Sequence, residues 1–298
     1  MPFPFSFELF PPRTAKVAER MPEITRVLGE AGPEFISVTF GAGGSSRDAS
    51  LDVLRQIRRN GDARPLAHLT CVGSSEAEAG AIIDRFIENG ILDFLALRGD
   101  PPKGLAETDE FLGDLRSGAE LTEFIRRRRD ARRTPGEEPL LVVAAYPNGH
   151  PQSRSIEQDY DALLAKQAAG ANLAITQLFF EAEDYLRFVE GARARGVAMP
   201  IMPGVMPITS VARLQRMAEL AGEAVPERWR RSLDACRSDR ARRELGIAHA
   251  AAMSHDLLEG GAPGIHVYTH NRTDEPLELL SRLGAISPAD ASVEPVAA

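Results

Sequence analysis

Eight short runs rich in β-branched, aromatic and leucine residues recur along the chain, and helical spacing of apolar residues separates them. The runs are Phe5–Phe10, Phe35–Phe40, Leu66–Val72, Phe94–Gly99, Leu140–Tyr146, Leu173–Phe180, Pro200–Val205 and Gly264–Thr269. The helical stretches include Asp48–Arg59, Glu76–Asn89, Leu121–Arg133, Ile156–Ala169 and Glu183–Arg195. Strands that alternate with helices predict a parallel sheet with right-handed crossovers. Eight such units predict a closed (β/α)8 TIM barrel, and an open doubly wound sheet is the alternative.

Glycines and two long intervals divide this pattern further. Four glycines stand just past predicted helices, where a left-handed residue is expected: Gly61, Gly90, Gly170 and Gly196. The intervals Pro101–Glu120, after the fourth strand, and Gly222–Glu244, before the eighth, predict inserted loops or helices. We expect one catalytic barrel over residues 1–287. Residues 288–298 are rich in Ala, Pro and Val without periodicity, so we expect a disordered tail.

Charge and hydropathy exclude several classes of protein. The chain of 298 residues carries 35 Lys and Arg against 43 Asp and Glu, a net charge of −8, and lacks the positive field that nucleic-acid or anionic-membrane binding needs. Its strongest apolar stretch, Leu140–Tyr146, is far shorter than the roughly 20 residues of a spanning helix. The N-terminus has no basic start and contains Glu8, unlike a signal peptide. Two cysteines make no disulfide framework. We therefore expect a cytoplasmic protein without nucleic-acid or membrane partners.

Side-chain alternation along the runs predicts which residues face the barrel interior. In the first run, Glu8 lies opposite Phe7 and Leu9. In the fourth, Leu95 and Leu97 are expected to face the helices, opposite the polar residues that follow. The polar residues near the carboxyl ends of the runs are Glu8, Thr39, His68, Arg98, Asp100, Tyr146 and Gln177. Each alone is equally well explained as a satisfied core group, but the ring as a whole indicates an active site.

Glu8 is the first candidate for chemistry. Its apolar neighbours predict a carboxyl pKa raised by desolvation, which suits a general acid, although pairing with Arg13 is an alternative. The sequence Arg98-Gly99-Asp100 resembles a ligand cradle. The glycine-rich segment Gly41–Ser46 suggests phosphate binding, but it matches neither the dinucleotide fingerprint nor a P-loop, so a simple turn is preferred.

Two rival chemistries for a barrel find little support. Metal-dependent hydrolysis needs several His and carboxylate ligands at strand ends, whereas the first strand has no His-x-His pattern, so no metal site is expected. Schiff-base chemistry needs a lysine in the lumen, and Lys16, Lys103 and Lys166 all lie outside the predicted strands. A barrel that binds a partner without catalysis remains a third class.

Eight motifs in order resemble those of one enzyme family. They are FSFELFPPRT, FISVTFGAGGS, AHLTC, ALRGDPP, VAAYPNGHP, GANLAITQLFF, PIMPGVMPI and HVYTHNR. In order and spacing they resemble the catalytic barrel of methylenetetrahydrofolate reductases, from about Phe5 to about Gly284. The resemblance implies non-covalent FAD, NADH or NADPH as electron donor, and ping-pong reduction of 5,10-methylenetetrahydrofolate to 5-methyltetrahydrofolate for methionine synthesis. Family members commonly form homo-oligomers, so we expect one here.

The resemblance also assigns roles to residues of this sequence. Glu8 corresponds to the general acid and Asp100 to a carboxylate near the flavin that stabilises a cationic substrate. Gln177, Tyr268 and Arg272 correspond to substrate-binding positions. The positions that match FAD contacts are Thr39, His68, Arg98, Gly99, Asp100, Tyr146, His150, Asp159 and Lys166. The chain departs from the family pattern at residues 111–118 and at Met217, where ligand contacts are expected to differ.

Overall fold

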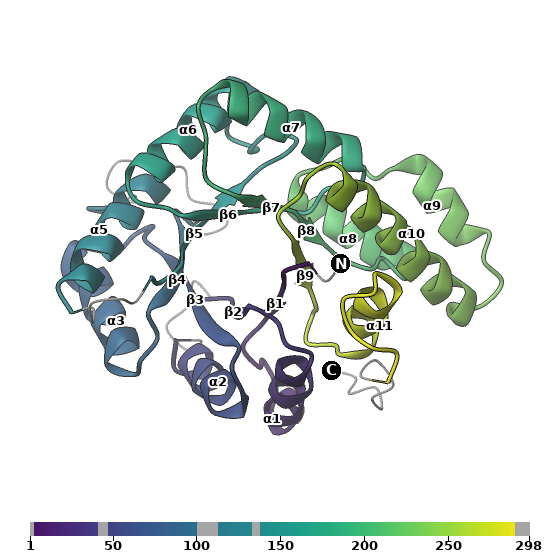
Figure 1. The fold of residues 1–298 in the computed structure, drawn as a ribbon, viewed down its shortest axis with the longest axis horizontal. Coiled ribbons are helices and arrows are strands. Elements are labelled where there is room, and N and C mark those ends of the chain that lie inside the picture. The colour runs from purple at the N-terminus through teal and green to yellow at the C-terminus, as the bar shows by residue number, and fades with distance from the viewer. Residues whose placement is uncertain (1–2, 41–46, 100–112, 133–137, 290–298) are drawn as a thin grey trace.

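A computed structural model describes residues 3–40, 47–99, 113–132 and 138–289 of the protein. Its parallel strands form a ring that helices surround on the outside (Figure 1). The strands are β1 (Phe5–Leu9), β2 (Phe35–Val38), β3 (Arg64–Thr70), β4 (Asp93–Leu97), β5 (Leu141–Ala145), β6 (Leu173–Thr176), β7 (Ile201–Met202), β8 (Gly204–Val205) and β9 (Ile265–Tyr268). The helices are α1 (Ala15–Glu30), α2 (Arg47–Asn60), α3 (Glu76–Glu88), α5 (Gly118–Asp130), α6 (Ile156–Ala168), α7 (Ala182–Ala194), α8 (Val211–Ala221), α9 (Glu227–Asp234), α10 (Asp239–Glu259) and α11 (Asp274–Arg282).

The ring closes where the first and last strands meet. β1 pairs in parallel with both β2 and β9, so that Glu8 lies in register with Ser37 on one side and Tyr268 on the other. The expected seventh strand is interrupted at Pro203, which has no backbone N–H to give to a ladder. Its two halves pair separately, β7 with β6 and β8 with β9. The predicted TIM barrel is confirmed, with nine strand segments in place of eight runs.

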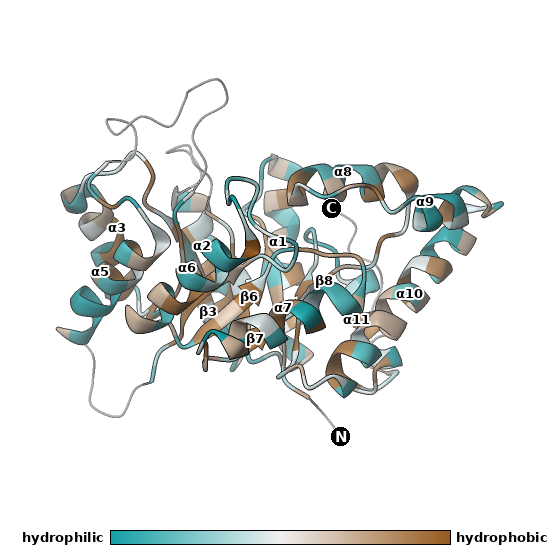
Figure 2. Ribbon diagram, turned by 90° about the horizontal axis from the view of Figure 1, so that it is seen from above, coloured by the Kyte–Doolittle hydropathy of each residue, from teal (hydrophilic) through white to brown (hydrophobic). Residues whose placement is uncertain are grey.

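Three buried clusters hold the barrel together. The largest lies between the strands and the helix layer, and includes Phe7, Leu9 and Phe94. A second fills the barrel interior on one side, with Phe35, Leu66, Leu95, Val142, Leu173, Ile175 and Met202. A third packs α8 and α9 beside the barrel around Trp229. The hydrophilic colouring of α9 in Figure 2 agrees with a short rim helix that buries little beyond Trp229 and Leu233.

The expectation for the fourth strand was wrong. Leu95 and Leu97 pack in the barrel interior, whereas Phe94 and Ala96 face the helices. The cause is that β4 is buried on both faces, and such a strand has no alternation of polar and apolar residues to reveal its orientation.

The expected helix ends are largely confirmed. Gly90, Gly170 and Gly196 adopt positive φ angles of 73°, 111° and 98°. Gly61 does not, so its assignment as a left-handed cap was wrong. The interval Gly222–Glu244 contains α9 and the first turn of α10, as an inserted helix requires. Residues 101–112 of the other interval, the segment Gly41–Ser46 and residues 290–298 of the expected tail lie outside the described residues.

Candidate active site

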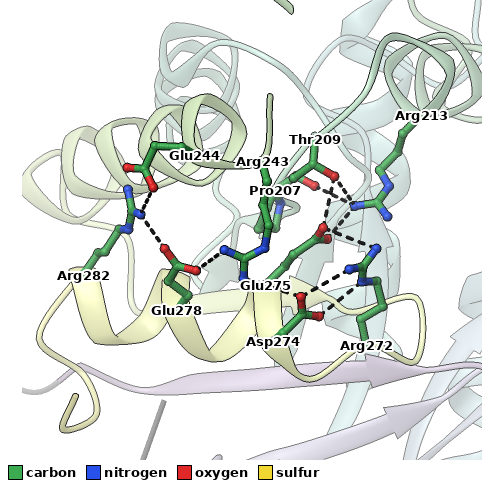
Figure 3. Close-up of polar contacts among 10 residues, drawn as sticks. All are labelled: Pro207, Thr209, Arg213, Arg243, Glu244, Arg272, Asp274, Glu275, Glu278 and Arg282. Atoms are coloured by element: carbon green, nitrogen blue, oxygen red, sulfur yellow. Dashed lines mark hydrogen bonds and ion pairs between the residues drawn. The ribbon is translucent and has the colours of Figure 1, made fainter. Parts of the chain in front are cut away.

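A cavity of about 760 Å³ opens at the carboxyl ends of the strands. Apart from Asp100 and Arg272, every predicted site residue lines it: Glu8, Thr39, His68, Arg98, Gly99, Tyr146, His150, Asp159, Lys166, Gln177 and Tyr268. Asp100 lies outside the described residues. Arg272 is not on the cavity wall and instead forms ion pairs with Asp274 and Glu275 (Figure 3). The structure thus brings together residues from both ends of the chain and from the middle.

Glu8 lines the cavity and is buried, with only 8% of its surface exposed. Burial raises its pKa to about 8, so the carboxyl group keeps its proton at neutral pH. The ring of His68 is a neighbouring basic group, and its Nε2 lies 3.6 Å from Glu8 Oε2. Burial lowers the pKa of His68 to about 3, so the ring is neutral. The contact is therefore between two uncharged groups, and Glu8 carries a proton rather than forming half of an ion pair.

A tight turn after β9 holds the strand end that carries Glu8. Thr269 Oγ1 donates to the Glu8 carbonyl oxygen at 2.7 Å, and Asn271 N donates to Thr269 Oγ1 at 3.0 Å. His270 and Asn271 both adopt left-handed backbone conformations, with φ of 52° and 59°. Such conformations are unfavourable for residues other than glycine and occur often at functional sites. The turn therefore fixes the backbone of Glu8 from the neighbouring strand.

Tyr268 forms part of the wall beside Glu8. Its hydroxyl group donates to the Thr176 carbonyl oxygen at 2.6 Å. Burial, followed by the nearby Glu8 and Tyr146, raises the pKa of Tyr268 well above its ordinary value, so the hydroxyl stays neutral. Gly204 makes room for this ring, because a Cβ atom there would lie 2.5 Å from Tyr268 Cε2 and 2.6 Å from the Thr176 oxygen.

The opposite wall carries a lysine and a carboxylate from α6. Lys166 Nζ donates to the Ala144 carbonyl oxygen at 2.9 Å, and burial lowers its pKa to about 8, an effect that Asp159 partly opposes. Asp159 in turn accepts hydrogen bonds from His150 N at 3.1 Å and Ser153 Oγ at 2.7 Å. Lys166 is thus a cation whose charged form a bound anion would stabilise.

Two further predicted residues take part in local contacts. Arg98 donates to Gln152 Oε1 through Nη2. Gln177 Oε1 accepts from the backbone N–H of Leu178 at 2.7 Å, so its amide is oriented by the chain itself.

Sequence reasoning missed several polar residues of the wall. These are Arg116, Ser117, Gln152, Ser153 and Gln158. Gln152, Ser153 and Gln158 belong to the loop after β5 and the start of α6, which already contained predicted His150 and Asp159. Ser117 is the N-cap of α5 and accepts from Glu120 N at 3.1 Å. Its position before a helical stretch is a capping signal that could have placed it at the barrel mouth.

A possible metal-binding group lies away from the cavity. Among the described residues, His255, Asp256 and Glu259 on α10 bring their ligand atoms within 4.8 Å of one another, but all three are exposed. None of them lines the cavity.

No helix within the described ranges is long and apolar enough to cross a bilayer.

A parallel barrel whose carboxyl-terminal mouth holds a protonated acid has the architecture of a TIM-barrel enzyme. Residues 2–284 match the family described as methylenetetrahydrofolate reductase. The 5,10-methylenetetrahydrofolate reductase of Pectobacterium carotovorum is 33% identical over 281 residues, which cover 94% of this chain and 89% of that protein. The Escherichia coli enzyme of the same name is 31% identical, with 94% and 90% covered. The chain belongs to the methylenetetrahydrofolate reductase family, whose named members are oxidoreductases.

Two other similarities differ in extent. Methylenetetrahydrofolate reductase (NADH) 1 of Arabidopsis thaliana is 32% identical over 95% of this chain, which spans only 48% of that protein, so the chain has about half the length of the plant relatives. A solved structure, described as an uncharacterized protein from Clostridium thermocellum that binds two copies of 5-methyl-5,6,7,8-tetrahydrofolic acid, has a TM-score of 0.60 and 15% identity. It covers 95% of this chain and 94% of its own, and at this identity the likeness concerns the fold.

Proposed function

We propose that the protein reduces 5,10-methylenetetrahydrofolate to 5-methyltetrahydrofolate, with non-covalent FAD and with NADH or NADPH as electron donor, in a ping-pong reaction that supplies methyl groups for methionine synthesis. The observation that carries the proposal is Glu8, a carboxyl group that burial keeps protonated at the barrel mouth. Membership of the family and the names of the relatives support the substrate and the nicotinamide donor.

The donors around the cavity suit a flavin dinucleotide. Lys166 and Arg98 are cations on the wall, where a pyrophosphate would bind. His68 Nε2 is buried and has no hydrogen-bond partner among the described residues, so it could form a hydrogen bond with the polar edge of the flavin ring. The remaining residues that would hold FAD are Thr39, Gly99, Tyr146, His150 and Asp159. When bound, a flavin would supply hydride transfer between nicotinamide and folate, chemistry that protein side chains do not provide.

The residues of this chain would then bind the folate and move one proton. Glu8 holds a proton on its carboxyl group and would give it to N10 of the folate, which opens the five-membered ring. The neutral Tyr268 and Gln177 line the cavity near this acid and would orient the substrate. Arg272 would hold the glutamate tail, and Asp100 would stabilise positive charge on the substrate.

The remaining expectations stay part of this proposal. They are a single catalytic barrel over residues 1–287, a cytoplasmic location and a homo-oligomeric assembly. The C. thermocellum protein, which is described as binding 5-methyl-5,6,7,8-tetrahydrofolic acid, supports a folate ligand for a barrel of this shape.

The proposal is tested by an anaerobic absorption spectrum of the purified protein. Flavin bands should bleach when NADH is added and return when methylenetetrahydrofolate follows, which would demonstrate both half-reactions. A colourless protein that FAD cannot reconstitute would refute the flavin assignment. Bands that bleach with NADH but do not return with the folate would identify a different flavin-dependent oxidoreductase.

A further inference from the structure

The barrel interior is polar around β1. Side chains alternate along a strand, and Phe7 and Leu9 pack beneath the helices, so Ser6 and Glu8 point into the barrel. The same alternation turns polar residues of β2, β3 and β9 inward, because the neighbours of these residues belong to the same outer cluster. The inward polar side chains are Ser6, Glu8, Ser37, His68, His266 and Tyr268. The strands from β4 to β7 contribute mainly apolar residues to the interior.

Two of these side chains present an unpartnered atom below the cavity wall. Ser37 Oγ and His266 Nε2 are buried and have no hydrogen-bond partner among the described residues. Unlike His68, neither residue lines the cavity. The ring of His266 is fixed by other contacts, since its Nδ1 lies 2.7 Å from Ser6 Oγ and it stacks on Phe35 with the centroids 5.9 Å apart. A buried polar atom without a hydrogen bond destabilises a fold, so both atoms require a partner.

Side chains from alternate strands meet inside this barrel with an offset of two residues. Glu8 of β1 lies in register with Ser37 of β2, which lies in register with Leu66 of β3. The side chain beside Glu8, however, is that of His68, two residues beyond Leu66, with the two polar atoms 3.6 Å apart. This offset agrees with the layers of barrels, in which alternate strands contribute to the same layer.

The same offset relates His266 to Ser37. His266 of β9 is in register with Ser6, and Ser6 is in register with Phe35, so Ser37 lies two residues beyond that row. The unpartnered atoms of Ser37 and His266 therefore belong to one layer, directly beneath Glu8. The side chain of a serine is short, and no direct hydrogen bond joins the two atoms.

The cavity extends to this layer. The two-residue offset adds Leu95 of β4 and Ile175 of β6 to the layer, and both of them line the cavity. A small polar molecule can therefore reach the layer from the cavity. Burial, together with the nearby His68, lowers the pKa of His266 to about 3, so the ring is neutral. An uncharged pair that offers both donors and acceptors suits a water molecule better than an ion.

We propose that Ser37 Oγ and His266 Nε2 hold a water molecule beneath Glu8, and that this water donates a hydrogen bond to the Glu8 carboxylate once its proton has been transferred. In that step the O–H bond of Glu8 breaks, an N–H bond forms at N10 of the folate, and the negative charge stays on the carboxylate. A buried carboxylate is unfavourable without donors, so the water stabilises charge where it develops. Ser37 and His266 are thus positioning residues. This inference rests on the proposed function and extends it to the environment of the acid.

The test compares three variants of the flavin-loaded protein. Ser37→Ala and His266→Phe each remove one hydrogen bond to the water. Ser254→Ala on α10 is the matched control, because Ser254 Oγ is equally buried and unpartnered among the described residues but lies outside the barrel interior. A crystal structure of the wild type should show a water within about 3.2 Å of Ser37 Oγ and His266 Nε2. This water should be absent from Ser37→Ala.

The pH profile of the folate half-reaction provides the kinetic readout. Among the described residues, the titratable side chains that face this layer are Glu8, His68, His266, Tyr268 and Tyr146. Burial keeps both imidazoles and the Tyr268 hydroxyl neutral, so Glu8 governs the decline near pH 8. Loss of a donor to the charged form raises a carboxyl pKa, so the decline should move to higher pH in Ser37→Ala and His266→Phe. The half-reaction should also slow about tenfold at pH 7, with flavin reduction by NADH unchanged.

The outcomes separate this role from a purely structural one. An unchanged pH profile in a folded Ser37→Ala protein, equal slowing of both half-reactions, or a wild-type crystal structure without the water would each overturn the proposal. If His266→Phe fails to fold, Ser37→Ala decides alone, because it removes only a hydroxyl group. A wild-type protein that does not reduce methylenetetrahydrofolate would refute the proposed function instead, and the crystal structures would still decide whether Ser37 and His266 hold a water.

Discussion

The side chain of Asn271 forms two hydrogen bonds with the backbone of Phe10. Its Oδ1 accepts from Phe10 N at 2.8 Å, and its Nδ2 donates to Phe10 O at 2.9 Å. The amide thus makes the two hydrogen bonds that a neighbouring strand would make with Phe10. This residue directly follows β1 and lies two positions after Glu8. Because the donor and acceptor of Phe10 are both satisfied, the chain after Glu8 is held in one direction.

Replacement of Asn271 by Ala should affect both stability and catalysis. The loss of two partly buried hydrogen bonds should lower the free energy of unfolding by about 1–3 kcal/mol. The strand end that carries Glu8 would loosen, so folate reduction should also fall about tenfold through misplacement of the acid. Asn172→Ala is the matched control, because Asn172 bonds Leu141 N at 2.8 Å and Pro139 O at 3.1 Å at the other end of the barrel. Equal activity in the two variants would contradict the role of Asn271.

Glu8→Gln should separate the two half-reactions. Reduction of the flavin by NADH should continue, whereas folate turnover should fall at least 100-fold, because a positioned general acid contributes about 10²–10⁴-fold. In the wild type, the rate of the folate half-reaction should decline as pH rises through about 8, where Glu8 loses its proton. Stopped-flow absorbance measures both half-reactions, with Glu19→Gln on the exposed face of α1 as the control. Retention of folate turnover by Glu8→Gln would refute the acid role.

The same substitution should change how stability depends on pH. The raised pKa means that folded Glu8 keeps its proton while the unfolded chain loses it above pH 4.5. At this group the unfolded state then binds fewer protons, so the contribution of Glu8 to wild-type stability should fall between pH 4.5 and about 8 and level off above that range. Glu8→Gln has no such group, so it should gain stability relative to the wild type as pH rises. Urea unfolding at pH 5 and pH 9 tests this, and a constant difference between the two proteins would contradict it.

Gly204→Ala should disturb the wall beside Glu8. The added methyl group would meet Tyr268 and the Thr176 carbonyl oxygen at contact distances that real atoms do not adopt. Such overpacking usually costs about 1–3 kcal/mol, and displacement of Tyr268 should raise KM for the folate. Gly61→Ala is the control, since a Cβ atom there has nothing within 4 Å and the backbone φ is not positive. If both variants melt at the same temperature, the close packing at Gly204 is not needed.

The sequence predicted the barrel and most of its cavity because both depend on local pattern. Polar residues stand near the carboxyl ends of the parallel strands, and these ends meet at one edge of the sheet. Glu8, His68 and Tyr268 could therefore be placed together from their positions in the strands. The orientation of β4 could not be predicted, since Leu95 and Ala96 are both buried and carry no contrast.

Contacts between distant segments lay beyond the sequence pattern. Pro203 splits a strand whose two halves pair with different neighbours, and only the closed sheet reveals this. Arg272 could be named as a candidate, but its ion pairs with Asp274 and Glu275 depend on how α11 begins. The partners of a charged side chain are set by three-dimensional packing rather than by spacing.

The adjacency of β1 and β9 has a consequence for biosynthesis. Glu8 emerges from the ribosome some 260 residues ahead of its neighbours Tyr268, Thr269 and Asn271. At about 5–20 residues per second, the nascent chain carries β1 without its neighbour β9 for tens of seconds. The acid therefore acquires its burial, and with it its raised pKa, only after nearly all of the barrel has been translated.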